Sequence, residues 1–276
     1  MKKKKLLLIA LLLVWVAPSF AAKVDTLLIK SPSMNKDVQV VVVTPDAALG
    51  KKAVVCPAIY LLHGYGGNAK TWIGIKPNLP QIADEKGIIF VCPDGKNSWY
   101  WDSPLNPSYR YETFISSELV KYIDEHYKTI ADRKGRAITG LSMGGHGAMW
   151  NAIRHKDTFG ASGSTSGGLD IRPFPKNWEM SVQIGEKAKY PENWEKYTVI
   201  NLVPTLRKDQ IALIFDCGDS DFFLEVNKNY HEALLKQGID HDFITRPGNH
   251  DSQYWNNSID YQILFFWKHF LKMKAL

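Results

Sequence analysis

The segment around Ser142 holds the side chain most able to do chemistry. Residues 136–147 read as an apolar strand, then Gly140-Leu141-Ser142-Met143-Gly144, then a helix. So sharp a turn from strand to helix strains the serine and exposes its hydroxyl above the sheet. Gly140 and Gly144 suit this turn because a Cβ at either position would collide with neighbouring backbone. We therefore predict that Ser142 is a nucleophile at the end of a strand.

A serine nucleophile needs partners, because its hydroxyl reacts poorly until a histidine takes its proton and a carboxylate holds that histidine. His250 follows an alternating, strand-like segment and a Pro-Gly-Asn turn, and Asp219 and Asp221 share a loop after an apolar run. Loops after strand ends are where open α/β sheets place their chemistry. We predict His250 as the base and Asp221 as the orienting acid, with Asp219 as the alternative.

An oxyanion hole is expected from a second Gly-rich segment. Residues 59–67 form a buried strand that runs into a loop with three glycines. One backbone N–H from this loop and one from the residue after the serine would bind a developing oxyanion. These amides belong to Tyr65 and Met143. We expect His63 to anchor the loop, and we favour a packing role for His146 over contact with substrate.

These motifs together resemble the esterase D superfamily of α/β hydrolases over nearly the whole chain after residue 35. That group includes feruloyl and acetylxylan esterases of the first carbohydrate esterase family, tributyrin esterases, S-formylglutathione hydrolases and the antigen 85 proteins. The resemblance implies Ser142 as nucleophile, His250 as base, Asp221 as orienter, and the Tyr65 and Met143 amides as the oxyanion hole. The segment 97–102 is most similar to the secreted esterase branch.

Several aromatic residues lie on loops expected near this site, and flat apolar rings suit contact with sugar faces or a phenolic acid. Core packing is the alternative for many of them, since tryptophan is buried on average. The candidate substrate-binding residues are Trp72, Trp99, Tyr100, Trp101, Trp178 and Trp255. No metal-ligand spacing, phosphate loop or dinucleotide motif is present, and serine chemistry needs no cofactor.

The N-terminus reads as a secretory signal peptide. Lys2–Lys5 precede the apolar run Leu6–Val16, which is short for a membrane span, and small residues at Ser19 and Ala21 favour cleavage after Ala21. We expect a signal peptide over 1–21, a single exported domain over 22–276, in the periplasm or secreted, and no stable membrane anchor. An uncleaved anchor is the alternative.

Charge and cysteine content narrow the class of protein further. Without residues 1–21, which hold four lysines and no acids, the formal charge falls from +6 to +2, so nucleic-acid binding is not indicated. Cys56, Cys92 and Cys217 are an odd number of thiols, so at least one is free. A disulfide bond between Cys56 and Cys92 is one possibility that the sequence leaves open.

Alternating strands and helices predict one α/β-hydrolase domain with a mostly parallel sheet and helices on both faces. An antiparallel N-terminal pair is expected at one edge, and an irregular insert over 170–208 is expected to wall the substrate pocket. The predicted strands are Val24–Lys30, Val38–Thr44, 57–62, 88–92, 136–140, 160–164, 211–217 and 241–246. The predicted helices are 79–86, 110–127, 143–156, 222–237 and 258–272.

The sequence therefore indicates an exported serine carboxylesterase, with feruloyl or acetyl esters of plant polysaccharide fragments as its expected substrates. An acyltransferase that uses the same triad with an alcohol acceptor is an alternative. A generic short-chain esterase or thioesterase is another, and a carbohydrate-binding protein on a hydrolase fold is a third. The oligomeric state is left open.

Overall fold

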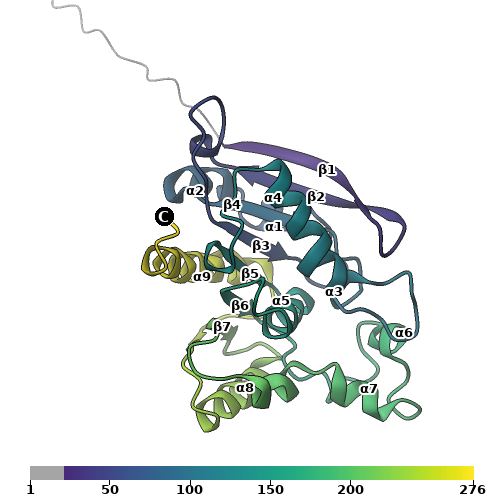
Figure 1. The fold of residues 1–276 in the computed structure, drawn as a ribbon. Coiled ribbons are helices and arrows are strands. Elements are labelled where there is room, and N and C mark those ends of the chain that lie inside the picture. The colour runs from purple at the N-terminus through teal and green to yellow at the C-terminus, as the bar shows by residue number, and fades with distance from the viewer. Residues whose placement is uncertain (1–21) are drawn as a thin grey trace, which may run out of the picture.

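The computed structural model of the protein describes residues 22–276, so the predicted signal peptide lies outside the described residues. Eight strands in these residues form one sheet in the order β1-β2-β4-β3-β5-β6-β7-β8 (Figure 1). Six strands, β3 to β8, run parallel, whereas β1 and β2 form an antiparallel edge. The predicted sheet and its N-terminal pair are confirmed. The strands are β1 (Lys23–Ser31), β2 (Lys36–Thr44), β3 (Ala58–Leu62), β4 (Ile89–Pro93), β5 (Arg136–Gly140), β6 (Ala161–Thr165), β7 (Ala212–Gly218) and β8 (Asp242–Arg246).

All five predicted helices are present, and most differ by a few residues at their ends, whereas the short helices α1, α6 and α7 were not predicted. A π-helical turn, Phe114–Leu119, joins α3 to α4, so the predicted helix at 110–127 is continuous. The last helix begins at Ser252 rather than 258 because the Asp251 carboxylate caps it and accepts the Tyr254 N–H at 2.9 Å. The helices are α1 (Thr71–Ile75), α2 (Leu79–Lys86), α3 (Tyr111–Thr113), α4 (Val120–His126), α5 (Met143–Arg154), α6 (Met180–Ile184), α7 (Pro191–Lys196), α8 (Leu224–Lys236) and α9 (Ser252–Lys272).

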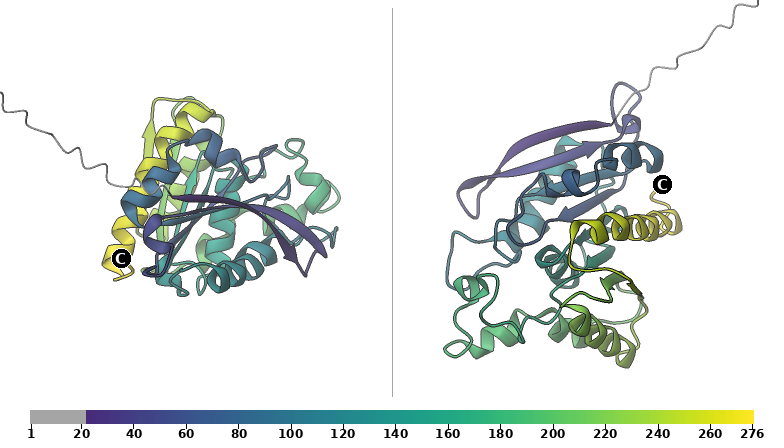
Figure 2. Two further views of the ribbon diagram at one scale, coloured as in Figure 1. Left: turned by 90° about the horizontal axis from the view of Figure 1, so that it is seen from above. Right: turned by 180° about the vertical axis from the view of Figure 1, so that it is seen from behind.

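The central strands of the sheet are buried on both faces, which explains why β3 and β4 read as continuous apolar runs. Alternate side chains of β3 enter different cores: Tyr60 and Leu62 pack on one side, and Ile59 and Leu61 on the other. Helices α4, α5 and α8 cover the first face, and α2 and α9 cover the second (Figure 2). The predicted layers of helix, sheet and helix are therefore confirmed.

The segment 170–208 interrupts the alternation, as predicted. It contains α6, α7 and a 3-10 turn at Val199–Thr205, and it lies on the far side of the molecule from the C-terminus (Figure 1). The Trp194 ring is fully buried, and its Nε1–H donates to the Gly185 carbonyl at 2.9 Å. The insert is held by packing onto the main core rather than by strand pairing, because Ile184, Trp194 and Val199 belong to the same buried cluster as the first face of the sheet.

The three cysteines lie in the interior of the fold. Cys56, Cys92 and Cys217 are all buried and free, so the Cys56–Cys92 bridge does not form. Burial raises the pKa of the Cys56 thiol to about 11.

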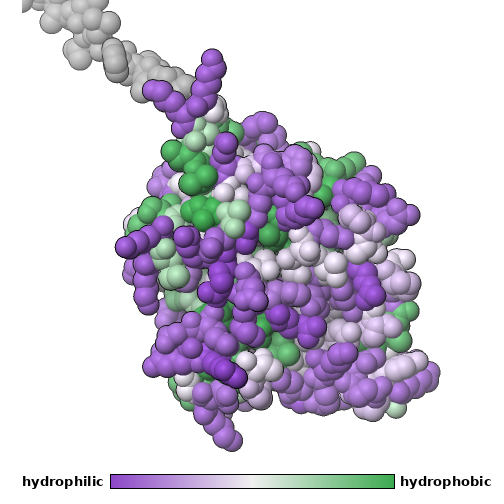
Figure 3. All heavy atoms as spheres, in the orientation of Figure 1, coloured by the Kyte–Doolittle hydropathy of each residue, from purple (hydrophilic) through white to green (hydrophobic). Residues whose placement is uncertain are grey.

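The face of the molecule seen in Figure 3 is mostly hydrophilic, with apolar residues in small scattered groups. Within residues 22–276, none of the helices is both long enough and apolar enough to cross a membrane.

Candidate active site

The turn between β5 and α5 places Ser142 in a strained conformation. Its backbone has φ 55° and ψ −117°, a region that L-residues rarely adopt. A Cβ on Gly144 would lie 2.3 Å from the Leu62 carbonyl oxygen, and one on Gly140 would lie 2.4 Å from the Gly144 carbonyl. Both glycines are therefore required by close backbone approach, as the sequence predicts.

The structure brings Ser142, His250 and Asp221 into one hydrogen-bonded chain. The Ser142 Oγ lies 2.9 Å from His250 Nε2, and His250 Nδ1 lies 2.8 Å from Asp221 Oδ2. Because Nδ1 faces a carboxylate, it carries the hydrogen, and the Nε2 lone pair is left to accept the serine proton. The Asp221 side chain is fully buried, and its other oxygen accepts the Phe223 N–H at 2.8 Å.

The neighbouring acids have other partners. Asp219 accepts hydrogen bonds from Ser220 Oγ at 3.0 Å and from the Gly248 N–H at 3.3 Å, so it fastens the acid loop to the histidine loop. Asp251 caps α9. The alternative assignment of Asp219 as orienter is therefore not supported, since the carboxylate that reaches His250 belongs to Asp221.

Asp216, near the end of β7, is a fully buried carboxylate. It accepts hydrogen bonds from Thr165 Oγ1 at 2.8 Å, from Gln262 Nε2 at 2.6 Å and from Ser258 Oγ. Burial raises the pKa of its carboxyl, and these donors oppose that rise. Thr165 also accepts the Ser142 N–H through its carbonyl, so this network links the nucleophile to β6, β7 and α9.

The predicted oxyanion-hole amides are available for a ligand. Among the described residues, neither the Tyr65 nor the Met143 N–H donates a hydrogen bond to another group. The loop that carries Tyr65 is held by His63, whose Nδ1 hydrogen bonds the Gly64 carbonyl at 2.7 Å, and by Asn97, which accepts the Gly66 N–H at 2.9 Å. The anchoring role expected of His63 is confirmed.

His146 is a core residue rather than a substrate contact. Its Nε2 accepts the Trp101 Nε1–H at 2.9 Å, and its Nδ1 hydrogen bonds the Gly168 carbonyl at 2.9 Å. Complete burial lowers its pKa to about 4, because the charged form cannot be solvated there. The favoured packing role is confirmed.

A cleft of about 460 Å³ opens above Ser142 and His250. Trp178, Phe222 and Trp255 form its aromatic walls, and the rings of Phe222 and Trp255 lie 4.3 and 5.1 Å from the His250 ring. Trp178 belongs to the insert, which therefore does wall the cleft. The remaining lining residues are Gly64, Tyr65, Gly66, Gly67, Thr71, Ile75, Leu141 and Ser252.

The placement of Trp72, Trp99 and Trp101 on the cleft is wrong. Each is at most 1% exposed, because each ring is packed in the core with its Nε1–H paired. Their acceptors are the Leu62 carbonyl, the Trp178 carbonyl and His146 Nε2, respectively. Tyr100 is also buried. Phe222, which is 52% exposed, was not among the predicted residues, and its only signal in the sequence is its place directly after Asp221.

In the part of the chain that the structure describes, the metal-ligating side chains form no group of three or more that could hold a metal ion. The site itself supplies a nucleophile, a base, an orienting carboxylate and two amide donors. These are the parts that acyl transfer through a serine requires.

The parallel sheet, the strained serine turn and the order of Ser142, Asp221 and His250 define an α/β hydrolase. The Esterase family model matches residues 31–266, and the chain belongs to that family. A solved ferulic acid esterase is 30% identical, with a TM-score of 0.77 over 91% of this chain and 99% of its own. The resemblance stated from the sequence is confirmed.

Two curated relatives are similar over most of their length, whereas the mycobacterial relatives match over 48% of theirs. An acetyl esterase of Caldicellulosiruptor saccharolyticus is 26% identical over 73% of this chain and 79% of its own. An S-formylglutathione hydrolase of Mus musculus is 26% identical over 76% of this chain and 80% of its own. Together with the family match, these relatives identify the chain as a carboxylic ester hydrolase.

Replacing Gly144 with alanine tests the close packing at the serine turn. The added Cβ would meet the carbonyl oxygens of Leu62 and His63 at 2.3 and 2.5 Å, so the backbone must shift. We expect a loss of unfolding free energy of about 2 kcal/mol or more, and loss of ester hydrolysis. Chemical denaturation and initial rates measure both effects. Gly74→Ala is the control, since a Cβ there meets nothing within 4 Å; equal effects of the two changes would contradict the argument.

The buried His146 side chain should make the free energy of unfolding depend on pH. Its folded pKa of about 4 lies below the unfolded value of about 6.5, so stability is full above pH 6.5 and falls as the pH drops toward 4. The loss attributable to this residue is about 3 kcal/mol at pH 4. Urea unfolding of the wild type and His146→Gln from pH 7.5 to 4 measures it. Parallel pH profiles for the two proteins would rule out this role.

Proposed function

We propose that the protein is an exported serine carboxylesterase that cleaves feruloyl or acetyl esters of plant polysaccharide fragments through an acyl-enzyme. The observation that carries the proposal is the hydrogen-bonded chain Ser142–His250–Asp221 at the floor of an aromatic cleft. Export is proposed on the basis of the basic and apolar residues at the N-terminus.

In the first step the Ser142 Oγ attacks the ester carbonyl carbon while His250 Nε2 takes the serine proton. Asp221 stabilises the resulting imidazolium through Nδ1–H. The amides of Tyr65 and Met143 donate to the oxyanion, and one such donor is worth about 3 kcal/mol of transition-state stabilisation. The carbon–oxygen bond to the alcohol then breaks, and His250 returns its proton to the departing oxygen.

In the second step water attacks the acyl-enzyme with His250 again as the base, and the acid leaves as Ser142 regains its proton. An alcohol in place of water would give transfer rather than hydrolysis. Measuring acid release against new ester at high alcohol concentration separates these outcomes.

The aromatic walls of the cleft support a feruloyl group, because its flat apolar face would lie against the rings. They also support an acetyl group, which would cover only part of the rings. Trp178 and Phe222 are stacked, with ring centroids 5.6 Å apart, and the Trp255 ring meets the His250 ring edge-on at 5.1 Å. Such rings contact a phenolic acid well. The neighbouring ferulic acid esterase and the related acetyl esterase support the same two acyl groups.

Ser142→Ala is expected to remove nearly all turnover and leave the fold intact. Loss of the nucleophile should lower kcat by about 10⁴-fold or more on 4-nitrophenyl acetate and methyl ferulate. A fluorophosphonate probe should label the wild type and not the variant. Undiminished hydrolysis by a purified variant would exclude Ser142 as the nucleophile.

Asp219 and Asp221 lie on one loop, so substitutions of these two acids provide a matched pair of variants. Asp221→Asn should lower kcat by about 10⁴-fold, because the amide no longer fixes the base in its reactive tautomer. Asp219→Asn should keep kcat within about tenfold, since Asp219 contacts Ser220 Oγ and the Gly248 N–H rather than His250. Steady-state rates on 4-nitrophenyl acetate distinguish them. A larger loss at Asp219 would reverse the assignment.

A further inference from the structure

Tyr100 lies between the two chain segments that carry the oxyanion-hole amides. Its side chain is fully buried, and its hydroxyl donates a hydrogen bond to the His63 carbonyl at 3.0 Å, just before Tyr65. Its own carbonyl accepts a hydrogen bond from Asn151 Nδ2 at 3.3 Å, and Asn151 belongs to α5, the helix that begins at Met143. Tyr100 therefore contacts the carriers of both amides.

The Tyr100 ring packs directly against backbone on two sides. A Cβ on Gly95, in the loop after β4, would lie 2.2 Å from Tyr100 Cε1, and one on Gly147 of α5 would lie 2.4 Å from Tyr100 Cδ2. Carbon atoms do not approach one another so closely, so the ring occupies the space that a side chain at either position would need. The ring therefore fixes the distance between the loop after β4 and α5.

His63 is bonded to the same loop through its side chain. Its Nδ1–H donates to the Gly64 carbonyl, so Nε2 keeps a lone pair and accepts the Gly95 N–H at 2.8 Å. Among the hydrogen bonds of residues 22–276, that of the Tyr100 hydroxyl is the one that the His63 carbonyl accepts. Without it, a buried carbonyl would lack a partner, and the peptide that leads to Tyr65 would be free to turn.

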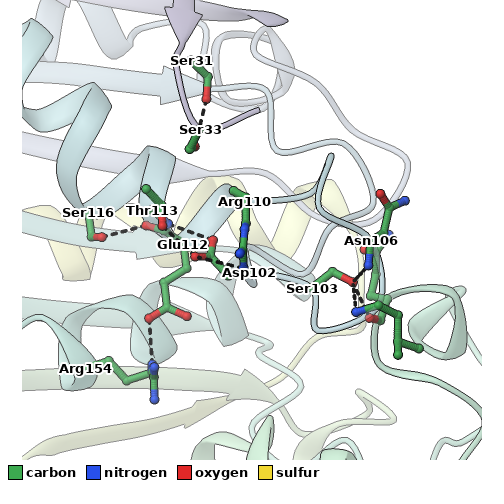
Figure 4. A network of polar contacts seen from close by, with 12 residues as sticks. Ser31, Ser33, Asp102, Ser103, Asn106, Arg110, Glu112, Thr113, Ser116 and Arg154 are labelled. Carbon is green, nitrogen blue, oxygen red and sulfur yellow. Dashed lines mark hydrogen bonds and ion pairs between the residues drawn. The ribbon is translucent and has the colours of Figure 1, made fainter. Parts of the chain in front are cut away.

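The backbone of Tyr100 is strained. Trp99 and Tyr100 are consecutive residues with φ of 57° and 59°, which is unusual for residues with bulky side chains. Shortly after them, the Asp102 carboxylate accepts hydrogen bonds from the Thr113 N–H at 3.0 Å and from Thr113 Oγ1 at 2.6 Å (Figure 4). Such strain persists only where neighbouring contacts hold it, and it is concentrated at functional sites.

A buried carboxylate joins this segment to α5. Glu112 of α3 is 6% exposed, and it accepts a hydrogen bond from Arg154 Nε at 2.7 Å (Figure 4) and another from Trp150 Nε1 at 2.7 Å. Both donors lie on α5. Tyr100 is therefore held in one position relative to the helix whose first amide is that of Met143.

We propose that Tyr100 is a positioning residue of the oxyanion hole, which sets the spacing of the Tyr65 and Met143 amides. It acts on the first amide through His63 and on the second through α5. Its side chain is fully buried, so it influences the reaction without touching the substrate. The oxyanion is present in the transition state and not in the bound ester, so misplaced amides should lower kcat more than they raise KM. The inference rests on the proposed esterase function and adds a positioning residue to it.

Tyr100→Phe removes the hydroxyl and keeps the ring. On 4-nitrophenyl acetate it should lower kcat by about tenfold and leave KM within about twofold, since the His63 carbonyl loses its donor. Tyr60→Phe is the matched control, because Tyr60 is also fully buried and its hydroxyl has no hydrogen-bond partner in the described part of the chain. The control should keep kcat within about twofold of the wild type. If the two variants have the same kcat, the proposal is overturned.

Phenyl trifluoromethyl ketone tests the oxyanion hole without turnover. Ser142 Oγ bonds to its carbonyl carbon, the serine proton passes to His250, and the carbonyl π electrons become the charge of an oxyanion held by the two amides. The inhibition constant should rise by about tenfold in Tyr100→Phe and stay within about twofold in Tyr60→Phe. Urea unfolding shows whether each variant is folded under the assay conditions. A Tyr100→Phe protein that loses stability but keeps the wild-type inhibition constant would reveal a packing role alone and overturn the proposal.

Failure of this inference and failure of the proposed function give different results. If the wild type hydrolyses 4-nitrophenyl acetate, and Tyr100→Phe matches it in both kcat and the inhibition constant of the ketone, the esterase stands and the role of Tyr100 is wrong. If the wild type cleaves no ester and is neither inhibited by the ketone nor labelled by a fluorophosphonate, the proposed function fails, and the inference fails with it.

Discussion

The close approach of α5 to the end of β3 is the contact on which the rest of the site depends. The Leu62 carbonyl accepts the Leu141 N–H at 3.2 Å and the Trp72 Nε1–H at 2.9 Å, while Gly144 packs against the same oxygen. One carbonyl thus joins the nucleophile turn, the first helix and the strand that leads to Tyr65. Because the nucleophile and one amide donor share this junction, their spacing is set by backbone rather than by flexible side chains.

The other half of the site depends on Asp216. Its buried carboxylate joins Thr165 of β6 to Ser258 and Gln262 of α9, and its own strand leads directly to the Asp221 loop. The hydrogen bond between the Ser142 N–H and the Thr165 carbonyl ties the nucleophile to the same network. The base, the acid and the nucleophile come from three separate loops. The hydrogen bonds of the buried Asp216 carboxylate help to fix the positions of these loops relative to one another.

The sequence predicted the parts of the site that are local in the chain. The glycines around Ser142 and the loops after β7 and β8 leave spacing signals, and those residues meet as expected. It was harder to predict which aromatic residues line the cleft, because the exposure of a ring depends on contacts that are distant in sequence. Trp101 is buried by His146, far along the chain, whereas Phe222 is exposed beside His250. Neither outcome leaves a local pattern.

The three buried thiols have a consequence for where this chain can fold. Thiol–disulfide exchange requires the thiolate, and burial keeps Cys56, with its pKa raised to about 11, almost wholly protonated. Burial raises the pKa of the Cys92 and Cys217 thiols in the same direction. The described residues therefore hold no disulfide and present little thiolate, so disulfide bonds take no part in stabilising this fold. Reducing agents leave such an enzyme unchanged, and oxidants find little to attack at cysteine.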